Sequence, residues 1–161
     1  MKKNKLHFLC GKMASGKSTL SKELARGHNA VLLCEDEILA ELYPVEIRTI
    51  QDYLNHSQRL KSVLKEHIVE LLKKGNSVVL DFPANTKNQR AWFREIFEGA
   101  NVEHIIHFVD KSDDVCKAHL RKRNENFPDD APLTSEETFD AITEYFEAPQ
   151  DEEGFNMEIY R

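Results

Sequence analysis

Residues 11–18 read Gly-Lys-Met-Ala-Ser-Gly-Lys-Ser, which fits the phosphate-binding pattern G-x-x-x-x-G-K-[ST]. Glycines let backbone N–H groups turn inward around phosphate oxygens, and the N-terminus of a following helix adds partial positive charge. In this pattern Lys17 reaches the β- and γ-phosphates of ATP, and the Ser18 hydroxyl can bind Mg²⁺. The alternative is a glycine-rich turn in which the lysine has no role in phosphate binding. We predict that the nucleotide site consists of Gly11, Lys12, Met13, Ala14, Ser15, Gly16, Lys17, Ser18 and Thr19.

Three consecutive acidic residues, Glu35, Asp36 and Glu37, follow the second apolar run of the chain. A carboxylate beside a phosphate loop can orient a hydroxyl and take its proton as a phosphoryl group is transferred to it. We favour Asp36 for this role. The alternative is that these acids only cap and charge the start of the following helix, and both interpretations can hold for different members of the run.

A third acidic position, Asp81, ends the apolar run 78–80 and is a candidate for holding Mg²⁺ together with Ser18, or for binding the acceptor. It could equally cap the next turn. We expect Asn85 and Arg90, which follow it, to face an acceptor pocket. Arg48, in the segment before the longest helix, is a further candidate because an acceptor with a phosphate or carboxylate needs an arginine or its equivalent. Taken alone, each arginine could also be an ordinary surface residue.

These candidates depend on the elements that position them. Apolar runs bounded by turn residues predict strands at 6–10, 30–34, 77–81, 104–109 and 157–160. Helical spacing of apolar residues predicts helices at 16–26, 36–42, 53–74, 88–98, 113–124 and 135–146. Alternating strands and helices indicate an α/β fold with a parallel sheet that has helices on both faces. Ligands of such sheets bind at the carboxyl ends of the strands, where all the candidates above lie.

The composition limits the class of protein. With 161 residues the chain has room for one domain, and 22 basic against 28 acidic residues give a net charge of −6. This charge disfavours a general nucleic-acid binder, although it permits a local basic groove. Three widely spaced cysteines form no zinc or disulfide pattern and fit a reducing compartment. We see no signal peptide and no membrane-spanning run, and therefore expect a cytoplasmic protein.

The loop at 11–19, the acids at 35–36, the run 78–81 and a late arginine-rich helix together resemble a small P-loop kinase. The resemblance is to the group that includes zeta toxin, chloramphenicol phosphotransferase and polynucleotide kinase, often described as AAA-family ATP-binding proteins. It implies a P-loop NTPase fold over residues 1–161: a three-layer, nucleoside-kinase-like sandwich with a parallel sheet of about five strands. It also implies an acceptor-side insert at about 43–60 and a lid at about 121–134.

In that family the aspartate after the second strand is the general base, which corresponds to Asp36, and lid arginines stabilise the transferred phosphoryl group. The matching residues here are Arg121 and Arg123. Because residues two apart on a helix do not share a face, we expect at most one to reach the phosphate, and we favour Arg123. The alternative is a solvated basic helix end that suits the helix dipole.

The resemblance implies a kinase that uses ATP and Mg²⁺ to phosphorylate a hydroxyl group of a small-molecule or nucleotide acceptor. Two alternatives stay open. One is an ATP-binding regulatory or interaction protein with weak hydrolysis. The other is a polynucleotide 5′-kinase, although the acidic composition favours a small-molecule acceptor over a polynucleotide. The acceptor and the oligomeric state are not specified by the sequence.

Overall fold

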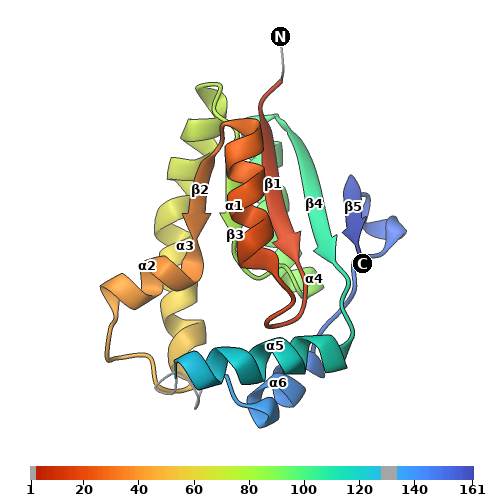
Figure 1. Ribbon diagram of the computed structural model, residues 1–161. Coiled ribbons are helices and arrows are strands. Elements are labelled where there is room, and N and C mark those ends of the chain that lie inside the picture. Colours follow the sequence, from red (N-terminus) through yellow and green to blue (C-terminus); the bar gives the residue numbers. More distant parts are fainter. Residues whose placement is uncertain (1–2, 128–133) are drawn as a thin grey trace.

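The computed structural model describes residues 3–127 and 134–161. Strands alternate with helices, as the sequence predicts (Figure 1). The elements are β1 (Lys5–Cys10), α1 (Lys17–His28), β2 (Val31–Cys34), α2 (Glu35–Leu42), α3 (Ile50–Lys73), β3 (Val78–Asp81), α4 (Lys87–Ala100), β4 (Glu103–Val109), α5 (Asp113–Asn126), α6 (Glu136–Thr143), the 3₁₀ helix η2 (Asp151–Glu153) and β5 (Met157–Tyr160).

The five strands form one parallel sheet in the order β2-β3-β1-β4-β5. In the register between β2 and β3, Cys34 lies opposite Asp81, so the acids that follow β2 start at the level where β3 ends. The predicted parallel sheet and the meeting of the acidic residues at its carboxyl edge are therefore confirmed.

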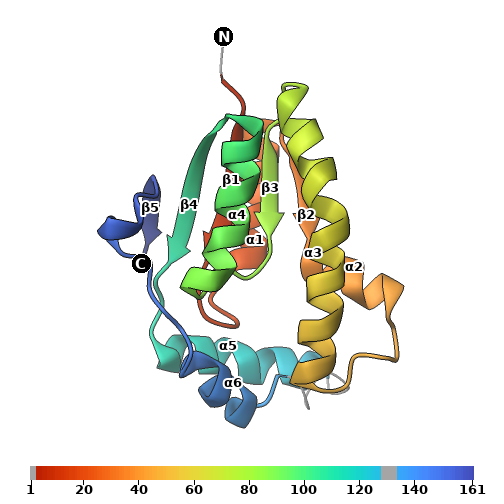
Figure 2. The ribbon, with the colours of Figure 1, turned by 180° about the vertical axis from the view of Figure 1, so that it is seen from behind.

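The sheet is the middle layer of a three-layer sandwich. Helix α1 covers one face in Figure 1, and α3 and α4 cover the other face, which is seen from behind in Figure 2. Rings from the sheet and from α4 interlock in the buried core on that second face; Phe8, for example, stacks on Phe93 with centroids 4.5 Å apart. Helices α5 and α6 lie across the carboxyl ends of the strands, beside the phosphate loop (Figure 1).

Several helix ends differ from the sequence prediction. Helix α1 continues through Gly27 and ends at Asn29, whose φ of 50° gives the left-handed cap that the prediction assigned to glycine. Helix α3 starts at Ile50, because Thr49 and Asp52 form a capping box there. Helix α6 begins at Glu136, after its N-cap Ser135, and ends at Thr143, three residues before the predicted end. Among the described residues, no helix is both long and apolar enough to span a membrane.

Candidate active site

The loop between β1 and α1 requires glycine at two positions for different reasons. A Cβ atom on Gly11 would lie 2.7 Å from the Ser15 Oγ and 3.0 Å from the Val109 carbonyl oxygen, so only glycine fits there. Gly16 has a φ of 102°, a conformation that L side chains rarely adopt, and it leads directly into the first turn of α1. The predicted phosphate loop therefore has the strand–loop–helix context that its chemistry needs.

The Lys17 ammonium lies in the mouth of this loop. Its Nζ donates hydrogen bonds to the carbonyl oxygens of Gly11, at 2.5 Å, and of Lys12, at 2.8 Å. Burial lowers the pKa of Lys17, and the negative charge of Asp81 opposes that effect. A buried ammonium group at the N-terminus of a helix is a suitable partner for the phosphates of a nucleotide.

Helix α5 packs against the phosphate loop from the other side of the site. His119 is hydrogen-bonded through Nδ1 to the Ala14 carbonyl oxygen at 2.9 Å, and Lys12 Nζ lies 2.8 Å from a carboxylate oxygen of Asp113. A small apolar cluster joins the same parts of the chain, and it consists of Met13, Ala14, Cys116, Leu120 and Phe139. The position of α5 is thus fixed relative to the loop.

Ser18 and Asp81 form the pair that the sequence predicts as a magnesium site. The Ser18 hydroxyl donates to Asp81 Oδ2 at 3.2 Å, and the Ser21 hydroxyl lies 3.4 Å from the same oxygen. Mg²⁺ in nucleotide sites takes one or two protein oxygens and completes its shell with phosphates and water, so this pair fits Mg²⁺. Residues 3–127 and 134–161 contain no cluster of three metal-ligating side chains, as a fully protein-bound metal would require.

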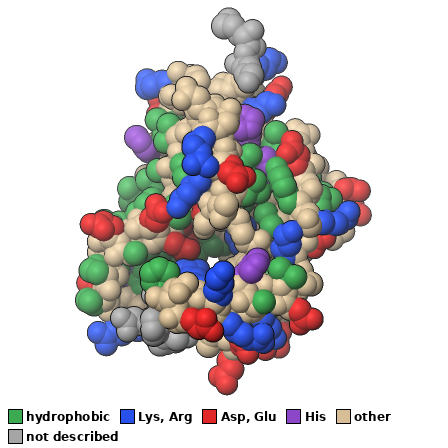
Figure 3. Space-filling model, viewed as in Figure 1, with side chains coloured by type: hydrophobic (Ala, Val, Ile, Leu, Met, Phe, Trp, Pro, Cys, Tyr) green, Lys and Arg blue, Asp and Glu red, His purple; other side chains and the backbone are tan. Residues whose placement is uncertain are grey.

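Asp36 is open to solvent at the first turn of α2 and lies among charged neighbours. Partial desolvation raises its pKa, as does the charge of Asp81, whereas the positive charges of Arg123 and Lys17 lower it. Four side chains from four segments therefore meet at the carboxyl edge of the sheet. Figure 3 shows that the surface is hollowed on this face and that Lys and Arg side chains border the hollow.

The two lid arginines have different surroundings. Arg121 donates to a carboxylate oxygen of Glu136 at 2.5 Å and thus ties α5 to α6, whereas the charge of Arg123 acts on Asp36. This arrangement supports the preference for Arg123. Residues 121–126 of the predicted lid belong to α5, and 128–133 lie outside the described residues.

A fully buried carboxylate, Glu35, lies next to Asp36; helix capping was one of the two interpretations that the sequence left open for it. It accepts hydrogen bonds from the Tyr53 hydroxyl and, at 2.6 Å, from the Ser57 hydroxyl. Burial raises the pKa of Glu35, and these hydrogen bonds oppose that effect. Tyr53 and Ser57 are four residues apart on α3, so they share one face of that helix, and both bond Glu35 at the start of α2. This spacing is the signal by which the sequence could have revealed the cluster.

A groove of about 580 Å³ runs between α3 and α4 from this carboxylate cluster. The α3 residues along it are Tyr53, Leu54, Ser57, Gln58, Lys61, Ser62 and Lys65, and the α4 residues are Asn88, Gln89, Trp92 and Glu95. Its location beside the first turns of α3 corresponds to the predicted acceptor-side insert, of which residues 50–60 are helical.

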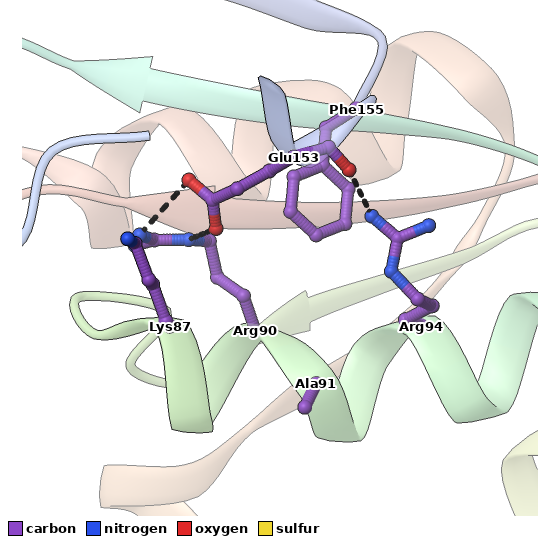
Figure 4. Close-up of a pocket in the computed structure, with 6 residues that line it drawn as sticks. All are labelled: Lys87, Arg90, Ala91, Arg94, Glu153 and Phe155. Atoms are coloured by element: carbon purple, nitrogen blue, oxygen red, sulfur yellow. Dashed lines mark hydrogen bonds and ion pairs between the residues drawn. The ribbon is translucent and has the colours of Figure 1, made fainter. Parts of the chain in front are cut away.

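Arg90, a further predicted acceptor contact, does not line this groove. Its side chain is fully buried and forms a bidentate pair with Glu153, at 2.8 and 3.2 Å (Figure 4). A third donor of the guanidinium reaches the Ala84 carbonyl oxygen at 2.9 Å. The structure therefore ties the Arg90 guanidinium to Glu153 and the Ala84 carbonyl, and its predicted contact with an acceptor stays untested. Local sequence patterns do not indicate this pairing, because Glu153 is 63 residues away from Arg90.

The neighbouring Asn85 supports the phosphate loop. Its Oδ1 accepts a hydrogen bond from the Gly11 backbone N–H at 2.9 Å. Arg48, the remaining predicted acceptor contact, is exposed in the turn before α3, and its Nε donates to the Val45 carbonyl oxygen at 3.0 Å. The structure therefore ties neither side chain to Asp36, and their predicted contacts with an acceptor stay untested.

Comparisons with known proteins agree with this geometry. No curated protein sequence matches the chain. Similar solved structures include a candidate kinase from Chloroflexus aurantiacus, with 18% identity, a TM-score of 0.76 and coverage of 99% of this chain and 88% of that one. The Mycobacterium tuberculosis APS kinase CysC in complex with AMPPNP and APS has 19% identity, a TM-score of 0.59 and coverage of 99% and 90%. Chaetomium thermophilum Kti12 in complex with ADP-AlF3 has 13% identity, a TM-score of 0.69 and coverage of 96% and 87%.

At these identities the neighbours establish the fold, which is that of the kinase-like P-loop NTPases. The narrower resemblance to the zeta-toxin, chloramphenicol phosphotransferase and polynucleotide kinase group stays a prediction. A family model described as an AAA domain matches residues 6–149, which is most of the chain. The protein therefore belongs to this AAA domain family.

Proposed function

We propose that the protein transfers the γ-phosphoryl group of ATP to a hydroxyl group of a small-molecule or nucleotide acceptor. The observation that carries the proposal is the placement of Asp36, which is open to solvent and lies within electrostatic reach of Lys17, Asp81 and Arg123. A phosphate loop alone supports nucleotide binding. A carboxylate with a raised pKa beside it supplies the group that a hydroxyl acceptor needs.

In this reaction Asp36 accepts a hydrogen bond from the acceptor hydroxyl and takes its proton. A bond forms between the acceptor oxygen and the γ-phosphorus, the bond from that phosphorus to the β–γ bridging oxygen breaks, and ADP leaves. The raised pKa of Asp36 makes its carboxylate a better proton acceptor than that of an ordinary surface aspartate.

Charge neutralisation is the task of the remaining residues. Lys17 binds the β- and γ-phosphates, and Arg123 reaches the transferred group from α5. Ser18 and Asp81 would hold Mg²⁺, which neutralises phosphate charge when bound. The likeness to a kinase solved with AMPPNP and APS supports this assignment.

The test is to incubate the protein with ATP and Mg²⁺ and pools of sugars, nucleosides, nucleotides and short oligonucleotides. Mass spectrometry then searches each pool for an added phosphoryl group, with wild type and Asp36→Asn compared. A product that depends on Asp36 supports the proposal and names the acceptor class. ATP binding without any product, and equal background hydrolysis in both proteins, would instead favour an ATP-binding regulatory protein.

A further inference from the structure

The groove between α3 and α4 is continuous with the site of Asp36. Tyr53 and Ser57, which line the near end of the groove, both donate hydrogen bonds to Glu35, and Glu35 directly precedes Asp36 in the first turn of α2. From Tyr53 to Lys61 the groove follows eight residues of α3, a length of about 12 Å. That distance fits the part of a nucleotide-sized or sugar-phosphate-sized molecule that lies beyond its reacting hydroxyl.

Lys61 is an unusual residue in this groove. Its side chain is partly buried, and burial lowers its pKa, with the charge of Glu35 acting in the opposite direction. Among residues 3–127 and 134–161 it forms no hydrogen bond or ion pair, and its Nζ lies 5.4 Å from the centre of the Trp92 ring. By contrast, Lys65, one turn further on, is paired with Glu95 at 2.6 Å. A desolvated amine without an anionic partner costs stability, and such groups concentrate at binding sites.

We propose that the groove binds the non-reacting part of the phosphoryl acceptor, that Lys61 pairs with a phosphate or carboxylate group of that molecule, and that Trp92 contacts its body. This inference rests on the proposed function and narrows the acceptor to an anionic hydroxyl compound. An anion beside Lys61 supplies the missing partner, and the indole face offers an apolar surface for a sugar or base ring.

The fluorescence of Trp92 can report binding in the groove, because Trp92 is the one tryptophan of the protein. The experiment keeps the phosphate loop saturated with AMPPNP and Mg²⁺, so that added anions report on the groove alone. Trp92 fluorescence is then titrated with pairs of compounds that differ by one anionic group: glucose and glucose 6-phosphate, uridine and uridine 5′-monophosphate, glycerol and glycerate. Inorganic phosphate serves as the minimal probe.

We expect at least one anionic compound to change the fluorescence saturably and to bind at least about tenfold more tightly than its neutral parent. Lys61→Met should remove that advantage, and Lys61→Arg should retain most of it. The matched control is Lys73→Met, which makes the same change at the far end of α3, where Lys73 pairs with Glu70. Thermal unfolding checks that Lys61→Met folds, and we expect its midpoint to equal or exceed that of wild type.

Equal affinity of neutral and anionic partners, equal binding by Lys61→Met and wild type, or no saturable response to any compound would overturn the proposal. The outcome is separable from that of the proposed function. A phosphorylated product formed without Lys61 dependence refutes the groove assignment and leaves the kinase intact. A Lys61-dependent fluorescence response without any product refutes the kinase and leaves the anion site intact.

Discussion

Two histidines inside the sheet make the protein sensitive to mild acid. His7 on β1 and His107 on β4 are both buried, and His7 Nδ1 lies 3.0 Å from His107 Nε2. The chain of hydrogen bonds continues from His107 Nδ1 to the Tyr160 hydroxyl at 2.8 Å, and from that hydroxyl to Glu158 at 2.9 Å. If Tyr160 donates to Glu158, both rings are neutral and His7 Nε2 is left without a partner among the described residues.

Burial lowers the pKa of His7 to about 3 and the pKa of His107 to about 4, and it is the largest cause for both rings. The charge of the exposed His28 lowers both pKa values further. In the unfolded chain both titrate near 6.5, so between about pH 6.5 and pH 4 the unfolded state binds more protons than the folded state. The stabilising effect of neutral rings is therefore complete above pH 6.5 and is lost as the pH falls. At pH 5 each histidine lowers the free energy of unfolding by about 2 kcal/mol relative to its value above pH 6.5, and the two together lower it by about 4 kcal/mol.

The assay is urea unfolding at pH 7.5, 6.5, 5.5 and 5.0, with wild type compared with His7→Gln. A loss of about 4 kcal/mol is a large part of the stability of an ordinary domain. Removal of one histidine should reduce the slope of unfolding free energy against pH by about 1.4 kcal/mol per pH unit below pH 6. Because both proteins share all other titrating groups, including Glu35 and Asp36, the difference in slope isolates the histidine. Equal slopes in the two proteins would refute the reasoning.

Three further substitutions test the buried pair beside the site and the two lid arginines. Glu153→Gln leaves the buried Arg90 guanidinium without its counter-charge, and we expect urea unfolding to show a loss of about 3–5 kcal/mol; a change below 1 kcal/mol would mean that the pair is not needed. Arg123→Ala should lower kcat by about 100-fold or more while ATP affinity falls much less, whereas Arg121→Ala should change kcat only a few-fold, because its partner is Glu136. The reverse order in steady-state kinetics would contradict the assignment of Arg123.

The parts of the site that the sequence predicted are those that local patterns determine. The phosphate loop is fixed by its own glycines and by the strand before it. Asp36 and Asp81 meet because the carboxyl ends of parallel strands share an edge, which topology alone requires. Helix periodicity limited the predicted phosphate contact to one of Arg121 and Arg123, and in the structure Arg121 pairs with Glu136 while the charge of Arg123 acts on Asp36.

The parts that sequence reasoning missed depend on contacts between distant segments. Arg90 has the right residue type and location for an acceptor contact, but its partner Glu153 comes from the end of the chain. Glu35 and Asp36 are adjacent and chemically alike, and only the direction of each side chain makes one a buried structural group and the other an accessible one. The end of α1 was misplaced because asparagine at position 29, rather than Gly27, adopts the left-handed cap.

The measurement that tests the central claim most directly is acceptor-dependent phosphoryl transfer in Asp36→Asn and in its neighbour Glu37→Gln. Both variants remove one negative charge from the first turn of α2, but Glu37 is exposed and lies 3.9 Å from Lys22, on the surface. We predict that Asp36→Asn lowers kcat by about 10²–10⁴-fold with ATP binding retained, and that Glu37→Gln stays within a few-fold of wild type. Equal turnover by wild type and Asp36→Asn would contradict the account.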